Sequence, residues 1–191
     1  DSKINKPYQE TKTFNYLGRI LSNDDDDTKC ILGQIQKARG RWNGIAKILK
    51  REGANATCMA RFYLAVIQAL LLYGSESWVI SKRNMDRLNS FHKRAVRHMT
   101  GQHIQKLGNN NWEYPDHDRL LKQCKLLPIN VYIERRRGTL WNYLLQHRKD
   151  LMNEAKLSIR HCKDVNKILW WEQEYIKKED MKSRTSEFFL N

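Results

Sequence analysis

The chain has 191 residues, of which 40% are hydrophobic and 29% are charged, and its formal net charge is +14 with an isoelectric point near 9.7. This composition excludes a disordered chain, and the longest mostly apolar run, Phe62 to Gly74, is too short to cross a bilayer. A charge of this size favours nucleic acid as the partner, because phosphates neutralise it. The cysteines are scattered and show no zinc-site spacing. They indicate reduced thiols in an intracellular compartment, with mitochondrion and nucleus both open.

Residues 1–22 are expected to form an entry segment with a short strand. Aromatic and β-branched residues surround Gly18, and they are Phe14, Tyr16, Ile20 and Leu21. This is the only strand that the sequence predicts. The run SNDDDD, Ser22 to Asp27, predicts a helix start, because carboxylates cap free amides and meet the positive end of the helix dipole. A divalent cation site is the alternative, but the glycine and later glutamate of a calcium loop are missing.

A first long helix is predicted from Cys30 to Leu49, where apolar residues recur at helical spacing, and Gly53 breaks it. Its other faces are basic, and no acid occurs between Asp27 and Glu52. Candidate phosphate-binding residues on this helix are Lys37, Arg39, Arg41, Lys47, Lys50 and Arg51. The alternative for each is a solvated helix face.

A second helix, capped by Thr57, is apolar on nearly every face and is expected to be the central helix of the core. It ends in the stretch LLLYGSESWVI, where Ser75 with Glu76 would form a site in a chemical interpretation. No histidine base is adjacent in sequence to Ser75. We therefore interpret Gly74, Glu76 and Trp78 as a structural elbow. In it the glycine stops the helix, the tryptophan packs, and the glutamate pairs with backbone amides or with an arginine.

A third helix is predicted to restart at Ser81 to Asn84 and to end at Gly101 as a C-cap. Its outward set is basic and comprises Arg87, His92, Lys93, Arg94, Arg97 and His98. From this set the candidate nucleic-acid-binding residues are Lys93, Arg94, Arg97 and His98. They would contact the phosphate backbone together with the first helix.

The rest of the chain predicts a turn-rich loop over residues 105–117 and then further helices. Trp112 and Tyr114 of this loop either pack in the core, which is favoured, or stack on bases. A third basic cluster, Arg135 to Arg137, lies in the helix after Pro128. The segment around Trp170 and Trp171 is expected to form a helical tail that meets other protein subunits.

The expected architecture is mainly α, a thumb-like bundle of six or seven helices with a short N-terminal strand. Its parts are an entry segment at 1–22, a helical domain at 23–157 and a Trp-containing tail at 158–191. The sequence holds no glycine-rich phosphate loop, no G-x-S-x-G elbow and no metal-spaced histidine pair. We therefore expect a protein that is not an enzyme and has no cofactor, no metal site and no membrane association.

Four segments in order carry a resemblance. They are FNYLGRILSNDDD, IQKARGRWNGIAKIL, RFYLAVIQALLLYGSESWVIS and LNSFHKRAVRHMTG. Together they resemble the C-terminal part, the palm end plus the thumb, of reverse transcriptases from non-LTR (LINE-type) retrotransposons. In that family an F-x-Y-L-G segment closes the palm, and L-Y-G-S-E-x-W is the elbow of a helical thumb. The resemblance runs from about residue 11 to residue 178.

The resemblance implies a thumb that grips an RNA or RNA–DNA duplex, and not a polymerase. The family's metal-binding Ala-Asp-Asp palm motif is absent from this chain, and polymerisation depends on such metal-held carboxylates. Because the first residue is Asp1, the chain is expected to be processed or part of something longer. It would be an excised thumb, a domesticated descendant, or a structural RNA-binding subunit of a large ribonucleoprotein such as a lineage-specific mitochondrial ribosomal protein.

Overall fold

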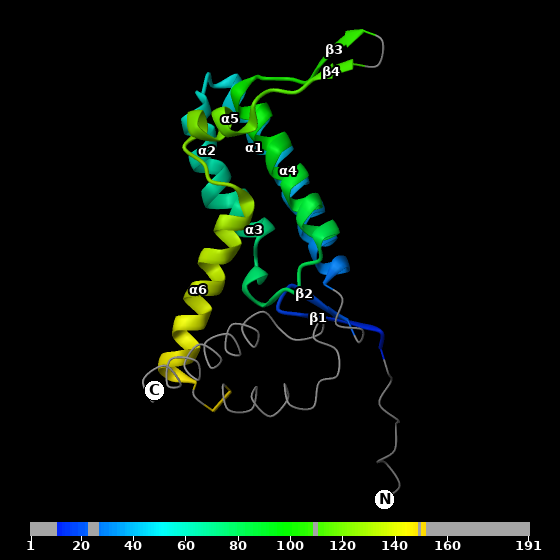
Figure 1. Ribbon diagram of the computed structural model, residues 1–191, viewed down its shortest axis with the longest axis vertical. Coiled ribbons are helices and arrows are strands. Elements are labelled where there is room, and N and C mark those ends of the chain that lie inside the picture. Colours follow the sequence, from blue (N-terminus) through cyan, green and yellow to red (C-terminus); the bar gives the residue numbers. More distant parts are fainter. Residues whose placement is uncertain (1–10, 23–26, 109–110, 149, 152–191) are drawn as a thin grey trace, which may run out of the picture.

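The computed structural model describes residues 11–22, 27–108, 111–148 and 150–151 (Figure 1). Helices dominate this part of the chain, so the expected mainly α class is confirmed. The long helices are α1 (Thr28–Arg51), α4 (Lys82–Thr100) and α6 (Ile129–His147), and α5 (His117–Cys124) is short. Three consecutive elements form one continuous helical segment, which we call the rod. They are α2 (Ala56–Phe62), the π-helical turn η1 (Tyr63–Gln68) and α3 (Ala69–Leu71).

Local sequence sets most of the helix ends. The Ser81 side chain caps α4 by accepting a hydrogen bond from the Asn84 amide at 3.3 Å, within the predicted restart at Ser81 to Asn84. Gly101 closes α4 with a φ of +70°, which confirms the predicted C-cap. The start of α2 differs from the prediction. Asn55, and not Thr57, is the N-cap, and its side chain accepts a hydrogen bond from the Cys58 amide at 2.9 Å.

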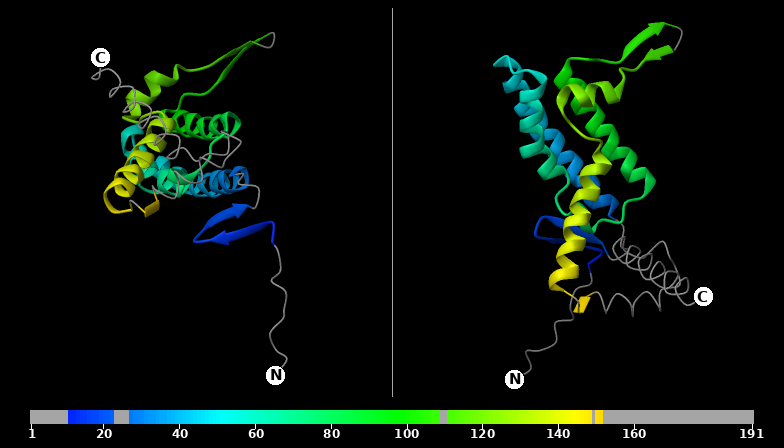
Figure 2. Two further views of the ribbon diagram at one scale, coloured as in Figure 1. Left: turned by 60° about the horizontal axis from the view of Figure 1, so that its bottom comes forward. Right: turned by 60° about the vertical axis from the view of Figure 1, so that its left-hand side comes forward.

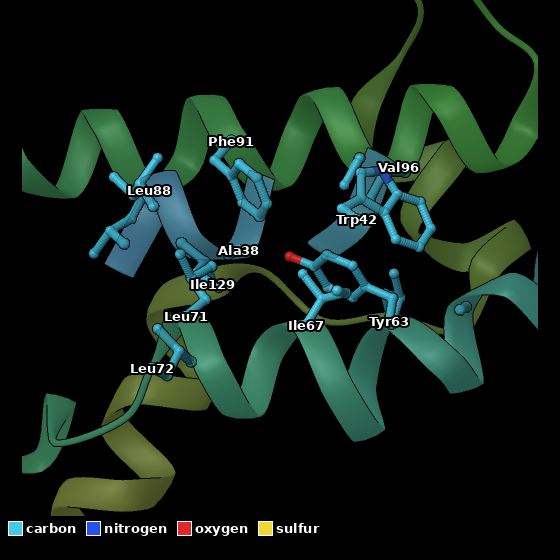
Figure 3. Packing of buried hydrophobic residues seen from close by; sticks show 14 of the residues in the cluster. Ala38, Trp42, Tyr63, Ile67, Leu71, Leu72, Leu88, Phe91, Val96 and Ile129 are labelled. Atoms are coloured by element: carbon cyan, nitrogen blue, oxygen red, sulfur yellow. The ribbon is translucent and has the colours of Figure 1, made fainter. Parts of the chain in front are cut away.

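The main core lies between α1, the α2–α3 rod and α4, and Figure 3 shows side chains of all three interleaving. Ile67, Leu71 and Leu88 are fully buried there. Each such aliphatic side chain contributes about 1.5–3 kcal/mol relative to leaving it in water. Helices α1 and α4 run side by side in the same direction, because Leu32 lines a groove with Arg83 while the Trp42 ring lies 5.9 Å from that of His98.

Two antiparallel hairpins flank the helices (Figures 1 and 2). Strands β1 (Thr13–Tyr16) and β2 (Arg19–Ser22) form the expected N-terminal hairpin, and Ile20 packs it against the core. Strands β3 (Gln105–Gly108) and β4 (Asn111–Glu113) form a second hairpin that projects away from the helices. The prediction of a loop there was wrong. Gly108, with a φ of +95°, adopts a backbone conformation that favours glycine.

The expected bundle of six or seven helices is not confirmed. The described helical segments are α1, the α2–α3 rod, α4, α5 and α6. The rod is also not buried on every face, since Phe62 and Val66 are 45% and 41% exposed. The tail at 158–191, with Trp170 and Trp171, lies outside the described residues. None of the helices in the described residues combines the length and hydropathy that a bilayer crossing requires.

Candidate nucleic-acid interface

The elbow after the rod is built around a glycine and a buried tryptophan. Gly74 has a φ of +76°, which ends the rod, and the 3₁₀ turn η2 (Ser75–Ser77) follows. Trp78 is fully buried, as the sequence predicts for the residue that fixes the turn. Ser75 is also fully buried, so its hydroxyl faces no solvent from which a substrate could reach it. The geometry therefore favours the architectural interpretation of this stretch over the chemical one.

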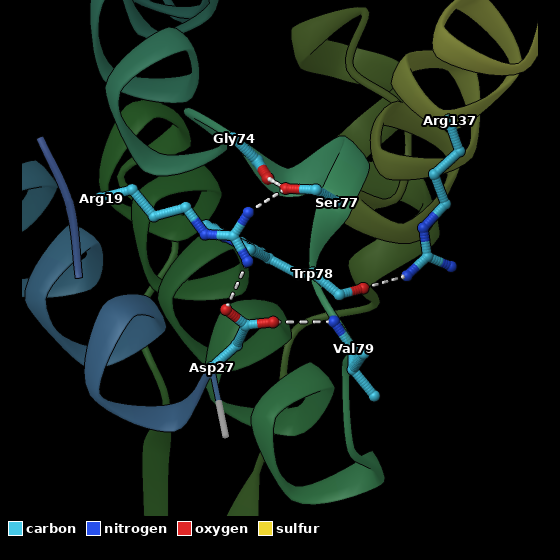
Figure 4. Close-up of polar contacts among 7 residues, drawn as sticks. All are labelled: Arg19, Asp27, Gly74, Ser77, Trp78, Val79 and Arg137. Carbon is cyan, nitrogen blue, oxygen red and sulfur yellow. Dashed lines mark hydrogen bonds and ion pairs between the residues drawn. The ribbon is translucent and has the colours of Figure 1, made fainter. Parts of the chain in front are cut away.

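Asp27 and Arg19 tie the elbow to the first hairpin and to the start of α1 (Figure 4). One carboxylate oxygen of Asp27 accepts a hydrogen bond from the Val79 amide at 2.9 Å, and the other pairs with the Arg19 guanidinium at 2.8 Å. Arg19 also donates to the Ser77 hydroxyl, which in turn donates to the Gly74 carbonyl oxygen at 2.9 Å. These contacts fix the direction in which the chain leaves the elbow toward α4.

The predicted role of the aspartate run needs correction at Asp27. This residue occupies the N-cap position of α1, but its side chain makes no capping hydrogen bond. Its carboxylate is instead bound to Arg19 and to the Val79 amide, because these long-range partners compete with the helix amides. Asp24 to Asp26 lie outside the described residues.

The Arg135 to Arg137 cluster is split by the fold. Arg137 donates to the Trp78 carbonyl oxygen at 3.0 Å and pairs with Glu134 at 3.2 Å, and burial lowers the pKa of its guanidinium. Arg136 is half-buried and lies 4.0 Å from the Glu76 carboxylate, so Glu76 does face an arginine, as expected. Arg135 alone of the three is exposed. Arg137 thus braces the elbow and is not directed to solvent.

A groove between α1 and α4 gathers four arginines. Leu32, Ile35 and Phe91 line it together with Asp86 and Ser90, and its volume is about 420 Å³. The guanidinium groups along it, which we call the arginine groove, belong to Arg39, Arg83, Arg87 and Arg94. Arg39 and Arg94 are predicted nucleic-acid-binding residues, Arg87 was predicted only to point outward, and Arg83 was not predicted. The signal for Arg83 was its helical spacing of four from Arg87 on the same face.

The cations of this groove are largely free of protein partners. Among the described residues, no carboxylate lies within ion-pair distance of Arg39, Arg83 or Arg94. Arg87 donates to the Asn84 side-chain oxygen at 2.9 Å. Asn84 is buried and donates to the Thr28 hydroxyl at 2.8 Å, which joins the first turns of α4 and α1. Neutral polar contacts therefore join the two helices beside the groove, while Arg39, Arg83 and Arg94 remain exposed.

The other predicted cations are spread over different faces. Lys50 lies near His98 at the far end of the α1–α4 pair, where burial, Lys50 and His103 lower the pKa of His98. Lys93 and Arg97 lie toward α5, where burial and these two cations lower the pKa of His117. Lys37 and Arg41 line a separate groove between α1 and the rod, Arg51 pairs with Glu52, and Lys47 is exposed.

His92 was expected to point outward, and that prediction was wrong. Its side chain is 1% exposed. The Leu127 carbonyl oxygen, 3.0 Å from His92 Nε2, only accepts, so Nε2 carries the proton and Nδ1 accepts from the Tyr63 hydroxyl at 2.8 Å. Burial lowers the pKa of His92 to about 4, so the ring is neutral. The prediction failed because His92 is polar, and polar side chains are usually assigned to the surface. Its partners Tyr63 and Leu127 are distant in sequence and allow the ring to be buried.

Within the described residues, no three histidine, cysteine, aspartate or glutamate side chains gather as metal ligands do. Comparisons with protein-family models, with curated proteins and with solved structures give no match to this chain. The functional interpretation therefore rests on the motifs of the sequence and on the arrangement of its cations.

Proposed function

We propose that this protein is a non-catalytic nucleic-acid-binding module, related to a reverse transcriptase thumb, that grips the backbone of an RNA or RNA–DNA duplex. The observation that carries the proposal is the arginine groove, which four arginines line and where, among the described residues, Asp86 is the one acidic residue of the lining. Arginine presents a planar fork of donors that matches phosphate oxygens in pairs.

The spacing of the groove suits a backbone ligand. From Arg83 to Arg94 helix α4 rises about 17 Å, a length that spans several phosphates of a nucleic-acid strand. Contacts of this kind position a duplex without reading its sequence. The elbow supports the same role, because its ties to Asp27 and Arg137 fix how α4 leaves the rod and hence how the groove is shaped.

The test compares two double variants that lose the same charge. Arg39→Gln with Arg94→Gln removes two groove cations, and Arg61→Gln with Arg119→Gln removes two exposed cations elsewhere. Binding to a blunt RNA duplex is followed by fluorescence anisotropy between about 50 and 200 mM salt. We expect the groove variant to lower the slope of log affinity against log salt by roughly 1.4–1.8, at about 0.7–0.9 per lost phosphate contact.

The control variant should change this slope little, because its arginines lie outside the groove. Equal weakening by both variants would mean that only the net charge matters and would overturn the groove as the binding site. The same measurements on an RNA–DNA hybrid of identical sequence show which duplex is preferred.

A second candidate function, a structural subunit of a large ribonucleoprotein such as a mitochondrial ribosome, is favoured by a different face. The exposed Phe62 and Val66 of the rod lie four residues apart on one helical face, and Val66 lines the groove with Gly40 and Arg41 of α1. An apolar stripe of this kind is typical of a protein contact. Co-sedimentation of the native chain with rRNA and ribosomal proteins, lost after RNase treatment, would favour this role. Recovery within a longer polypeptide with polymerase activity would favour a thumb.

A further inference from the structure

The β3–β4 hairpin, which we call the arm, and the residue after it expose large aromatic side chains, so the favoured prediction that Trp112 and Tyr114 pack in the core was wrong. Trp112 is 51% exposed and Tyr114 is 66% exposed. Leu107, on the opposite strand, is 64% exposed. Both figures of the whole molecule show the arm pointing away from the helices (Figures 1 and 2). An isolated two-stranded hairpin gains little stability from such side chains in water, so their placement calls for a ligand.

One face of the arm combines an aromatic ring with a cation. Lys106 and Trp112 are direct cross-strand partners, so their side chains share a face of the hairpin. The Lys106 ammonium lies 5.8 Å from the centre of the Trp112 ring. Tyr114 follows two residues later, directly after β4. The arm therefore offers flat rings beside a positive charge.

The root of the arm is cationic as well. It leaves the C-terminal end of α4, the helix that also carries Arg94 of the arginine groove. Lys50 and His103, which lies at the root, both come near the His98 ring, whose pKa is lowered mainly by burial. On the α5 side, Lys93 and Arg97 act on His117 in the same way. An anionic chain that leaves the groove at this end would pass between these cations to reach the arm.

These observations favour nucleobases over a protein partner. Every base presents a flat π face, so aromatic rings stack on bases with little sequence preference, and an adjacent phosphate is attracted by the neighbouring cations. Aromatic side chains also occur at protein interfaces, but there a contiguous apolar patch surrounds them. Leu107 is the only exposed aliphatic side chain within the described residues of the two strands.

We propose that the arm is a base-stacking element, in which Trp112 and Tyr114 stack on unpaired bases of a strand that leaves the duplex held in the arginine groove. The inference rests on the proposed function, and it narrows the ligand to a nucleic acid with a junction between duplex and single strand. The arm would act at the end of the duplex, while the groove holds the paired part.

The test uses the full chain with two RNA ligands, a blunt duplex and the same duplex with a short single-stranded extension at one end. We expect the extension to raise the affinity of the unaltered protein roughly tenfold. The double variant Trp112→Ala with Tyr114→Ala should lose this gain and keep its affinity for the blunt duplex. The conservative pair Trp112→Phe with Tyr114→Phe should retain most of it, and Leu107→Ala, on the same arm, should retain all of it.

A base analogue in the extension gives a direct reading of stacking. The fluorescence of 2-aminopurine next to the junction should be quenched by the unaltered protein and not by the double alanine variant. If the blunt duplex does not bind at all, the proposed function fails. If it binds but the extension adds nothing, or if the gain survives in the double alanine variant, the arm is not a base-stacking element and a protein neighbour becomes its expected partner. Circular dichroism confirms that the helices are intact in every variant.

Discussion

Two segments of the molecule share the spacing of a glycine and a tryptophan and use it in opposite ways. Gly74 precedes Trp78 by four residues, and Gly108 precedes Trp112 by the same interval. Both glycines have positive φ, +76° and +95°. Trp78 is fully buried, whereas Trp112 is 51% exposed. The local pattern therefore determines the backbone conformation of the turn, but it does not determine whether the aromatic ring is buried or exposed.

The difference lies in the partners that reach each segment from elsewhere in the chain. The elbow receives Asp27 at the Val79 amide and Arg137 at the Trp78 carbonyl oxygen. The arm has its own paired strands and the cation of Lys106. A glycine–tryptophan turn that gains such long-range contacts is part of the packed structure, and its aromatic ring is buried. One that projects from the body keeps its aromatic side chain available to a ligand.

The largest difference in stability is expected between alanine substitutions of the two tryptophans. Trp78→Ala should lower the free energy of unfolding by about 3–5 kcal/mol, because it removes a fully buried aromatic side chain and leaves a cavity. Trp112→Ala should lower it by about 0.5 kcal/mol or less. Urea unfolding followed by circular dichroism measures both. Similar losses for the two variants would contradict the contrast between elbow and arm.

The helical body between the two segments should respond to pH through His92. Its pKa is about 4 in the fold against about 6.5 in an unfolded chain, so the unfolded chain takes up the proton first. The pKa difference therefore adds to the free energy of unfolding above about pH 6.5, where His92 is neutral in both states. This contribution, about 3 kcal/mol at most, is lost as the pH falls toward 4. His117, whose pKa is also lowered, acts in the same direction.

Urea unfolding at pH 7, 5.5 and 4 measures this loss. His92→Gln should be less stable at pH 7 and should show a shallower dependence on pH. A variant with the same pH dependence as the unaltered protein would show that the Tyr63–His92–Leu127 network is not the titrating element.

A smaller effect distinguishes two arginines on the same helix. Arg137→Ala leaves the Trp78 carbonyl oxygen without this donor and should lower the free energy of unfolding by about 1–3 kcal/mol. Arg135→Ala is the matched control, since it removes the same charge from an exposed position of α6. Its stability should change by about 0.5 kcal/mol or less. Equal losses of unfolding free energy in the two variants would show that Arg137 does not stabilise the elbow.

The smallest expected effect separates the two glycines. Gly74→Ala should cost about 1–2 kcal/mol of global stability, because a side chain is strained at positive φ while the added Cβ meets ordinary contacts 3.8 Å from Arg19 and 3.9 Å from Trp78. Gly108→Ala carries a similar local strain but should loosen only the arm. Hydrogen exchange of the arm amides, set against urea unfolding of the whole chain, tells local from global loss. A global loss in Gly108→Ala would show that the arm is coupled to the core.

The sequence predicts the features that local chemistry controls. The mainly helical class, the helix restart at Ser81 to Asn84, the stop at Gly101 and the elbow glycine all follow from helical spacing and from capping preferences. The arm was missed because Gln105 to Gly108 shows no strand alternation and the following asparagines favour turns. Its pairing depends on the backbone and not on an apolar pattern.

The candidate site was predicted in part, for a related reason. Arg39 and Arg94 were selected by charge alone, but the groove exists because α1 and α4 run in parallel, which no spacing within one helix reveals. His92 and Arg137 were assigned to solvent because they are polar. Partners that are 35 and 59 positions away in sequence hold them instead, namely Leu127 and Trp78.

The sequence separation of the elbow contacts has a kinetic consequence. Asp27 and Val79 are 52 positions apart, and Arg137 and Trp78 are 59 apart, so these contacts require large chain loops to close. The arm pairs residues 106 and 112, and hairpins of this kind form within about 1–10 μs. We therefore expect the arm to form early and the elbow to close late, after the main folding barrier. Substitutions at the elbow should then mainly raise the unfolding rate constant. The contacts of this turn would therefore determine how long the folded chain persists before it unfolds.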